Sequence, residues 1–136
     1  MNIVLDTNVF ISCLLSNSLS RFLLSSKNVV FFIAEYSLEE INEHRLELIE
    51  KFGEEREFDE ILSFLLSKLR IVKNDEIKSF KEQAKEIMDL IDKDDTPVIA
   101  VALAINADGI WSFDSHFKRQ NRIRVFETNE ILRLTN

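Results

Sequence analysis

Three acidic positions in the 136-residue chain are placed so that folding could bring them to one site. Asp6 directly follows a short apolar run, and Asp114 follows another. A third acidic group, Asp92-Lys93-Asp94-Asp95, stands just before an apolar stretch at residues 98–105. Carboxylate oxygens are ligands that Mg²⁺ and Mn²⁺ prefer, and such ions bind phosphates and activate water. If the chain brings these acids together, they indicate metal-assisted chemistry on a phosphate.

The charges near these acids favour a metal ion rather than a basic side chain as their partner. Two carboxylates about 4 Å apart repel by roughly 4 kcal/mol at an effective dielectric constant of about 20. No lysine or arginine lies directly beside Asp6 or within residues 96–108. We therefore expect a hard cation, Mg²⁺ or Mn²⁺, to neutralise the acidic group.

The elements that must position these acids alternate along the chain. Short runs rich in Val, Ile and Phe predict strands at residues 2–5, 29–34, 70–72, 109–113 and 123–126. Apolar residues repeat at helical spacing over 58–69 and 77–91, and 98–105 is apolar on all sides. This order predicts an α/β fold with a mainly parallel sheet of about five strands flanked by helices. Because ligands bind at the carboxyl ends of such strands, we expect Asp6 and Asp114 at the binding edge.

Composition limits the class of protein further. The length predicts one domain, residues 1–136, and the net charge of −7 argues against binding nucleic acid or membranes through positive charge alone. Cys13 is the single cysteine, so we expect a buried apolar residue and no internal disulfide. His44 and His116 are too few for a zinc set and are expected at the surface or its boundary. With no leader-like segment and no apolar run of about 20 residues, we expect a cytoplasmic protein that does not enter a membrane.

Each candidate acid also has a structural explanation. Asp6 taken alone is explained as a turn or cap residue, Asp95 as a helix-start residue, and Asp114 as the beginning of a turn. Ser37 and Glu40 have the spacing of a capping box, which would explain Glu40 without any catalytic role.

The order of the motifs points to a known family. The segments VLDTNVF, YSLEEINEH, DDTPVIAVALA and IWSFDSHF follow one another along the chain. In this order they resemble the PIN-domain nucleases, and in particular the VapC-like toxin components of toxin–antitoxin pairs. The resemblance spans nearly the whole chain, and it implies a PIN-like fold in which the first and fourth strands are neighbours.

The resemblance also implies a set of site residues. The acids that would bind the metal and carry catalysis are Asp6, Glu40, Asp95 and Asp114. Two polar residues would support them, Asn8 beside the metal or its water and Ser112 two residues before the last acid. Glu39 stays a rival for Glu40, and Asp94 is spaced less well than Asp95.

The implied activity is hydrolysis of phosphodiester bonds in single-stranded RNA, with one or two Mg²⁺ or Mn²⁺ ions activating water and leaving a 3′-hydroxyl and a 5′-phosphate. The implied partners are an RNA substrate and an antitoxin protein, and a homodimer stays open. The basic segment 118–124 carries four positive charges in seven residues and would either grip RNA or form a solvated loop.

Three other classes of function compete with this one. A non-catalytic RNA- or partner-binding module on the same fold is the main alternative. A haloacid-dehalogenase-like phosphatase usually has a second Asp where this chain has Asn8. A nucleotide-binding loop cannot be built around Gly53 and Gly109, the only two glycines.

Overall fold

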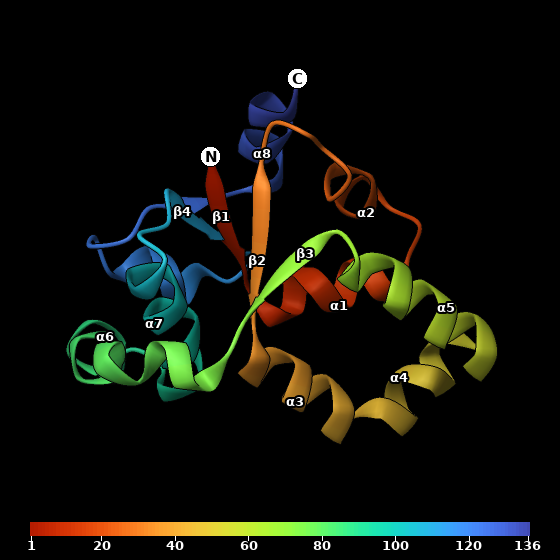
Figure 1. Ribbon diagram of the computed structural model, residues 1–136, viewed down its shortest axis with the longest axis horizontal. Helices are drawn as coiled ribbons and strands as arrows, with labels where there is room; N and C mark the ends of the chain where they lie inside the picture. Colours follow the sequence, from red (N-terminus) through yellow and green to blue (C-terminus); the bar gives the residue numbers. More distant parts are fainter.

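Five short parallel strands form the centre of the computed structural model, which describes residues 1–136 (Figure 1). Their order across the sheet is β3-β2-β1-β4-β5, and each neighbouring pair is parallel. The strands are β1 (Asn2–Leu5), β2 (Val30–Ala34), β3 (Leu69–Val72), β4 (Gly109–Trp111) and β5 (Val125–Phe126). The α/β fold predicted from the sequence is confirmed, and so is the expected pairing of the first and fourth strands.

Helices cover both faces of this sheet. The α-helices are α1 (Thr7–Leu15), α2 (Leu19–Leu23), α3 (Glu35–Glu43), α4 (Arg45–Phe52), α5 (Glu55–Leu66), α6 (Lys81–Met88), α7 (Thr96–Ala104) and α8 (Thr128–Thr135). Three short 3₁₀ helices join them, η1 (Asn74–Phe80), η2 (Lys93–Asp95) and η3 (Ser115–Arg119). In Figure 1, α6 and α7 lie on one side of the strands, and α1, α2 and α5 lie on the other. None of the helices is both long enough and apolar enough to cross a membrane.

The covering on both faces explains why the strands do not alternate between apolar and polar residues. Ile3 and Leu5 of β1 belong to a core cluster that includes residues of α1 and α5. Val4, between them, belongs to a second cluster built mainly with α6 and α7. Because successive side chains of a strand point to opposite faces, both faces of β1 must be apolar.

Two strands are shorter than predicted for local reasons. β4 ends at Trp111 instead of residue 113, since the hydroxyl of Ser112 bonds to groups outside the strand and the chain turns there. β5 begins at Val125 instead of residue 123, because the backbone amide of Ile123 donates a hydrogen bond to the side chain of Gln120 in the preceding loop. The helix predicted over 77–91 is divided into η1 and α6 and ends at Met88.

Gly109 allows β4 to pass close to β5. A Cβ atom at this position would lie 2.7 Å from the backbone oxygen of Arg124 and would also meet the ring of Phe126. Only glycine avoids this overlap, so the strand that leads to Ser112 and Asp114 can pair with β5.

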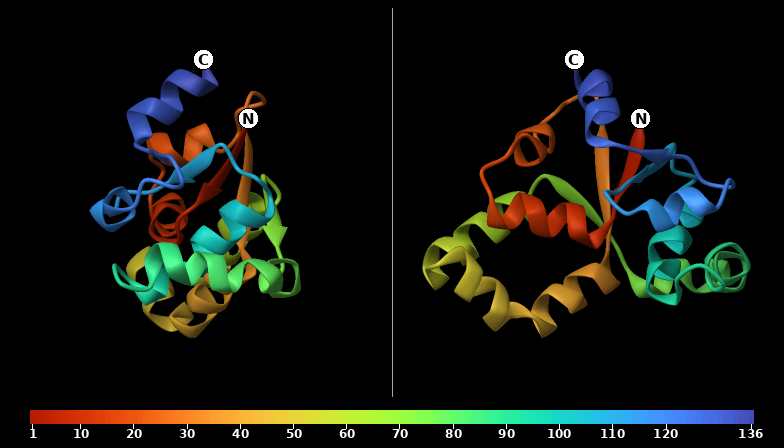
Figure 2. Two further views of the ribbon diagram at one scale, coloured as in Figure 1. Left: turned by 90° about the vertical axis from the view of Figure 1, so that its left-hand side faces the viewer. Right: turned by 180° about the vertical axis from the view of Figure 1, so that it is seen from behind.

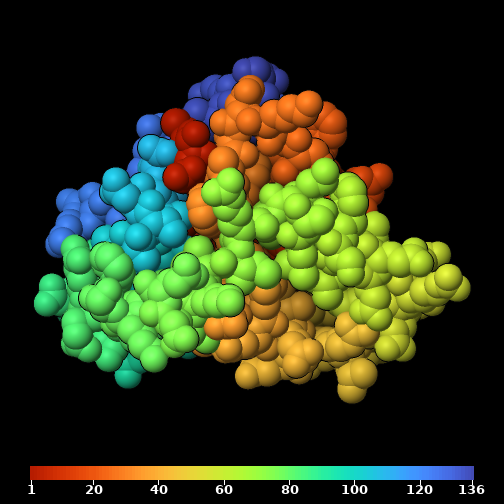
Figure 3. All heavy atoms as spheres, in the orientation of Figure 1, coloured from red at the N-terminus to blue at the C-terminus, as the bar shows by residue number.

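The two chain ends mark one side of the molecule. In Figures 1 and 2 they lie opposite α3, near the beginning of β1. In Figure 3, the atoms of α3, α4 and α5, coloured orange to light green, extend as a lobe to the lower right. The sequence predicted the site at the carboxyl ends of β1 and β4. These strand ends therefore lie on the side of the molecule away from the chain ends.

Candidate metal centre

Asp6 and Asp114 are linked through one hydroxyl group. In the pairing of β1 with β4, Leu5 lies opposite Trp111, so the next residues, Asp6 and Ser112, leave the sheet side by side. Ser112 Oγ donates a hydrogen bond of 2.8 Å to Asp6 Oδ2, and the backbone amide of Asp114 donates one of 2.9 Å to Ser112 Oγ. The two predicted acids thus stand together at the carboxyl edge of the sheet.

Asp6 is a buried carboxylate, with 4% of its surface exposed. Burial raises its pKa, and the charge of Asp114 adds to the rise, while the Ser112 hydroxyl and nearby backbone amides oppose it. Asp6 precedes α1 as its N-cap residue but makes no side-chain cap bond there. The side chain of Asp6 is bonded to Ser112, so a cap role alone does not account for it.

Asp95 reaches the same site from the junction of η2 and α7. Burial raises the pKa of Asp95 to about 7, and the charges of neighbouring carboxylates, among them Asp6 and Asp114, contribute to the rise. The Oδ2 atom of Asp95 is buried and has no hydrogen-bond partner. Asp95 is the N-cap residue of α7, as its helix-start interpretation predicted, but its side chain makes no cap bond.

Glu40 lies on α3 and contacts the residue that follows Asp6. The hydroxyl of Thr7 is 3.2 Å from Glu40 Oε1 and 2.7 Å from Ser37 Oγ. Burial raises the pKa of Glu40, with further contributions from the charges of Asp94 and Asp6, and the Thr7 hydroxyl opposes the rise. The side chain of Glu40 is therefore within electrostatic reach of the acidic cluster.

The predicted capping box at Ser37 and Glu40 is wrong. Helix α3 begins at Glu35 with Ala34 as its N-cap residue, so Ser37 already lies inside the first turn. Ser37 is fully buried and its hydroxyl contacts Thr7. The sequence spacing was right for a box, but the helix starts three residues before the position that a Ser37 cap requires, and Glu40 keeps no cap role.

The rival acids are more exposed than Glu40 and Asp95. Glu39 is exposed, and its Oε1 accepts a hydrogen bond of 2.9 Å from the side-chain amide of Asn74. Asp94 is also exposed, whereas Asp95 is partly buried. Asn8 is exposed in the first turn of α1, two residues after Asp6. Burial raises the pKa of both Glu40 and Asp95, and the charge of Asp6 contributes to the rise in each.

Two further residues join the cluster. The sequence placed Asp92 in the third acidic group without choosing it as a ligand, and it did not identify His116 as a site residue. Ligand atoms of Asp92, Asp95, Asp114 and His116 all lie within 4.8 Å of one another. His116 Nδ1 is 3.3 Å from Asp92 Oδ2 and 3.4 Å from Asp114 Oδ1. His116 was expected at the surface boundary, and its side chain is indeed 45% exposed, but its Nδ1 faces the acids. The signal in the sequence for His116 was its position two residues after Asp114, at the start of η3.

The donor set fits a divalent cation. Carboxylate oxygens suit Mg²⁺ and Mn²⁺, and one imidazole nitrogen suits Mn²⁺ better than Mg²⁺. The only two buried side-chain polar atoms without a hydrogen-bond partner are Asp95 Oδ2 and His116 Nδ1, and both belong to this cluster. No lysine or arginine forms an ion pair with these acids.

The basic segment 118–124 is only partly free. Lys118 pairs with Glu127, and Arg124 lies over the ring of Phe126 with its guanidinium 3.7 Å from Glu130. Arg119 and Arg122 are exposed and form no ion pair. Two of the four charges therefore remain available to an anionic ligand.

A family match covers the part of the chain that builds this centre. Residues 4–129 match a family model described as the PIN domain. The chain belongs to the PIN domain family. A comparison with curated protein sequences gives no match. The family resemblance inferred from the four motifs is therefore confirmed for this PIN domain.

The fold of the PIN domain is also found in a solved structure. It matches a chain in "Crystal structure of VapBC2 from Rickettsia felis bound to a DNA fragment from their promoter", with a TM-score of 0.72 and 18% sequence identity. The match covers 93% of this PIN domain and 98% of that chain. At this identity the likeness concerns the fold, which the two chains share from end to end.

Proposed function

We propose that this PIN domain is a Mg²⁺- or Mn²⁺-dependent endoribonuclease that hydrolyses phosphodiester bonds in single-stranded RNA. The observation that carries the proposal is that Ser112 bonds both the carboxylate of Asp6 and the backbone amide of Asp114, while Asp95 has an unsatisfied carboxylate oxygen. Repulsion between the carboxylates makes such a group energetically unfavourable without a cation. Membership of the PIN domain family indicates phosphodiester hydrolysis as the type of reaction.

Each residue of the site has a proposed role. We assign Asp6, Glu40, Asp95 and Asp114 to the metal. Ligand atoms of Asp92 and His116 converge with those of Asp95 and Asp114, whereas Asp6 and Glu40 lie outside that converging group. Ser112 keeps the carboxylate of Asp6 in place, and Asn8 contributes a polar group beside the metal. When bound, Mg²⁺ or Mn²⁺ would supply Lewis-acid activation of water and neutralise charge at the phosphate. A carboxylate of the site accepts the proton that the water loses.

We place the RNA backbone along Arg119 and Arg122, which are exposed, unpaired and close in sequence to Asp114. By the same family resemblance, we propose that the protein is the toxin of a toxin–antitoxin pair in the cytoplasm, with an antitoxin as its partner. The acidic surface outside the basic segment suits a basic antitoxin segment, and the VapBC2 structure supports an assembly of this kind.

A cleavage assay tests the proposal. Mixed structured and unstructured RNA is incubated with the protein in Mg²⁺, in Mn²⁺ and in EDTA, and the product ends are mapped. We expect cleavage of the unstructured RNA with either metal, none in EDTA, and 3′-hydroxyl and 5′-phosphate ends. RNA binding without cleavage in any metal would support the alternative, a non-catalytic binding module on the PIN fold.

A further inference from the structure

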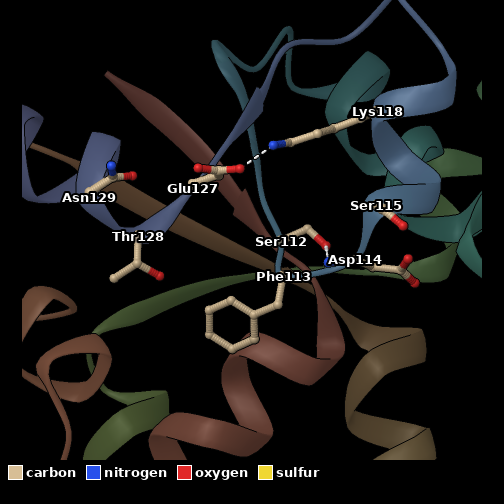
Figure 4. Close-up of a pocket in the computed structure, with 8 residues that line it drawn as sticks. All are labelled: Ser112, Phe113, Asp114, Ser115, Lys118, Glu127, Thr128 and Asn129. Carbon is tan, nitrogen blue, oxygen red and sulfur yellow. Dashed lines mark hydrogen bonds and ion pairs between the residues drawn. The ribbon is translucent and has the colours of Figure 1, made fainter.

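A pocket lies directly beside the metal centre and takes no part in the roles proposed above. It has a volume of about 440 Å³ and opens between the end of β4 and the start of α8 (Figure 4). Its lining includes Phe113, Asp114, Lys118, Glu127, Thr128 and Asn129. Asp114 belongs to both the pocket and the acidic cluster, so a ligand in the pocket would also be next to the metal-binding carboxylates.

Phe113 is the single apolar residue in this lining. The chain leaves the sheet at Ser112, and the ring of Phe113 therefore stays outside both core clusters, 52% exposed. Figure 4 shows Phe113 and Asp114 leaving the chain in different directions, with Phe113 on the side of Thr128. Phe113 has no aromatic or cation partner, whereas the exposed ring of Phe64 is covered by Lys68 at 5.1 Å. About half of the Phe113 side chain is thus accessible to a flat ligand.

The polar groups around the ring are suited to an uncharged ligand. Thr128 Oγ1 accepts a hydrogen bond of 3.2 Å from Trp111 Nε1, which leaves the hydroxyl hydrogen of Thr128 free to donate. The side-chain amide of Asn129 is exposed and forms no hydrogen bond within the chain, so it offers a donor and an acceptor. Lys118 and Glu127 neutralise each other across the rim.

We propose that this pocket binds one unpaired nucleobase of the RNA, stacked on Phe113 and contacted by Thr128 and Asn129. The proposal rests on the proposed ribonuclease function. An aromatic ring stacks with any base, and amide and hydroxyl groups read the edge of a base that is free of its partner. A base held here would place its neighbouring phosphate beside Asp114. Duplex RNA cannot present a base in this way, which gives the site its preference for single strands.

Binding of a short labelled single-stranded RNA tests this pocket. All proteins carry Asp6→Asn so that the strand stays intact, and affinity is measured by fluorescence anisotropy. We expect Phe113→Ala to weaken binding about tenfold, the loss typical of one stacked base, and Phe113→Leu to weaken it similarly. Phe113→Tyr should bind as tightly as the parent protein. Phe22→Ala is the matched control, because Phe22 is more exposed, at 74%, and lies on α2 outside the pocket.

A second arm uses the same RNA with single abasic residues. For the parent protein, replacing the bound base by an abasic residue should lower affinity about as much as Phe113→Ala does. The Phe113→Ala protein should bind the abasic RNA and the intact RNA equally well. Unchanged binding by Phe113→Ala, or full binding by Phe113→Leu, overturns the stacking site, even if wild-type protein cleaves RNA. RNA binding could instead depend on Phe113 while the wild-type protein shows no metal-dependent cleavage. That result would support the base-binding pocket and overturn the nuclease function.

Discussion

Ser112 donates its hydroxyl hydrogen to Asp6 across 106 positions of the sequence, at 2.8 Å, while accepting the amide of Asp114. This single hydroxyl orients one acid through its side chain and the other through its backbone. The carboxylate of Asp6 is held by Ser112, and that of Asp114 accepts a hydrogen bond of 2.8 Å from the backbone amide of His116, as expected of a residue that begins a turn. Both are held before any metal binds, so changes to either charge can be separated from changes to the fold.

Replacing either acid by its amide should remove activity without unfolding the protein. Asp6→Asn and Asp114→Asn take away one negative charge from a repelling group, so we expect the metal-free proteins to melt at the same temperature as wild type or above it. RNA cleavage should be lost in both. Thermal melting in EDTA and cleavage in Mn²⁺ are the measurements. An unfolded metal-free variant, with activity that follows only the folded fraction, would show that the acid is structural.

The pKa of Asp95, raised by burial and like charges to about 7, predicts how stability depends on pH. Between its ordinary pKa of 3.8 and this value, the folded metal-free protein binds a proton that the unfolded chain releases. Stability should therefore fall as pH rises from about 4 to about 7. Asp95→Asn should flatten this dependence, and the exposed Asp94→Asn should leave it unchanged. Melting temperatures in EDTA across this range measure the effect, and saturating Mn²⁺ should reduce it because the cation keeps the acids ionised.

Glu40 can be separated from its neighbours on α3. Glu40→Gln keeps an oxygen that accepts from Thr7, so we expect nearly native thermal stability and loss of most cleavage. Ser37→Ala leaves the Thr7 hydroxyl with one partner fewer and should cost roughly 1–3 kcal/mol of stability, with activity retained while the protein is folded. Glu39→Gln is the control and should stay active. A fully active Glu40→Gln protein, or an inactive Glu39→Gln protein, would mean that Glu40 is not the second acid.

The unpaired arginines should govern the salt dependence of RNA binding. Arg119→Gln with Arg122→Gln removes two exposed cations, and the slope of log affinity against log salt should flatten by about 0.7 for each phosphate that is no longer neutralised. Metal affinity should change little. The double variant Arg56→Gln with Arg70→Gln removes the same charge from α5 and β3 and should leave the slope unchanged. Binding titrations at several salt concentrations measure the slopes of the two double variants. If both slopes equal that of the wild-type protein, the RNA binds on another surface.

His116 should affect which metal is preferred. Its Nδ1 lies among the carboxylates, and a nitrogen ligand favours Mn²⁺ over Mg²⁺. We expect His116→Gln to weaken Mn²⁺ binding more than Mg²⁺ binding when the metal-free protein is titrated in a calorimeter. His44, the other histidine, is exposed between α3 and α4, and His44→Gln should change neither affinity. If His116→Gln instead binds both metals more tightly, the imidazole acts as a competing cation and is no ligand.

The sequence was most informative where a pattern depends on neighbouring residues alone. The strand from Asn2 to Leu5 is bounded by a charge, and its limits were predicted correctly. The start of α3 could not be predicted, because Ser37 is held by a tertiary bond to Thr7 rather than by a cap. Likewise, the turn that exposes Phe113 depends on the Ser112–Asp6 bond between distant residues.

The same difference between local patterns and long-range contacts explains which site residues the sequence identified. Asp6 and Asp114 were placed at one edge because parallel strands align their carboxyl ends. Asp92 was named only as part of its acidic group, and His116 was not identified, because η2 and η3 come together only in the folded protein. The separation of Asp92 from His116 along the chain carries no sign of that contact, although His116 lies two residues after Asp114.

The pairing of β1 with β4 also determines when the acidic centre can first form. During synthesis β1 is made before β4, with more than a hundred residues between them, and Asp114 and η3 follow later still. Until then, Asp6 has neither Ser112 nor Asp114 beside it. A growing chain on the ribosome therefore carries an incomplete acidic centre until β4 and η3 have been made.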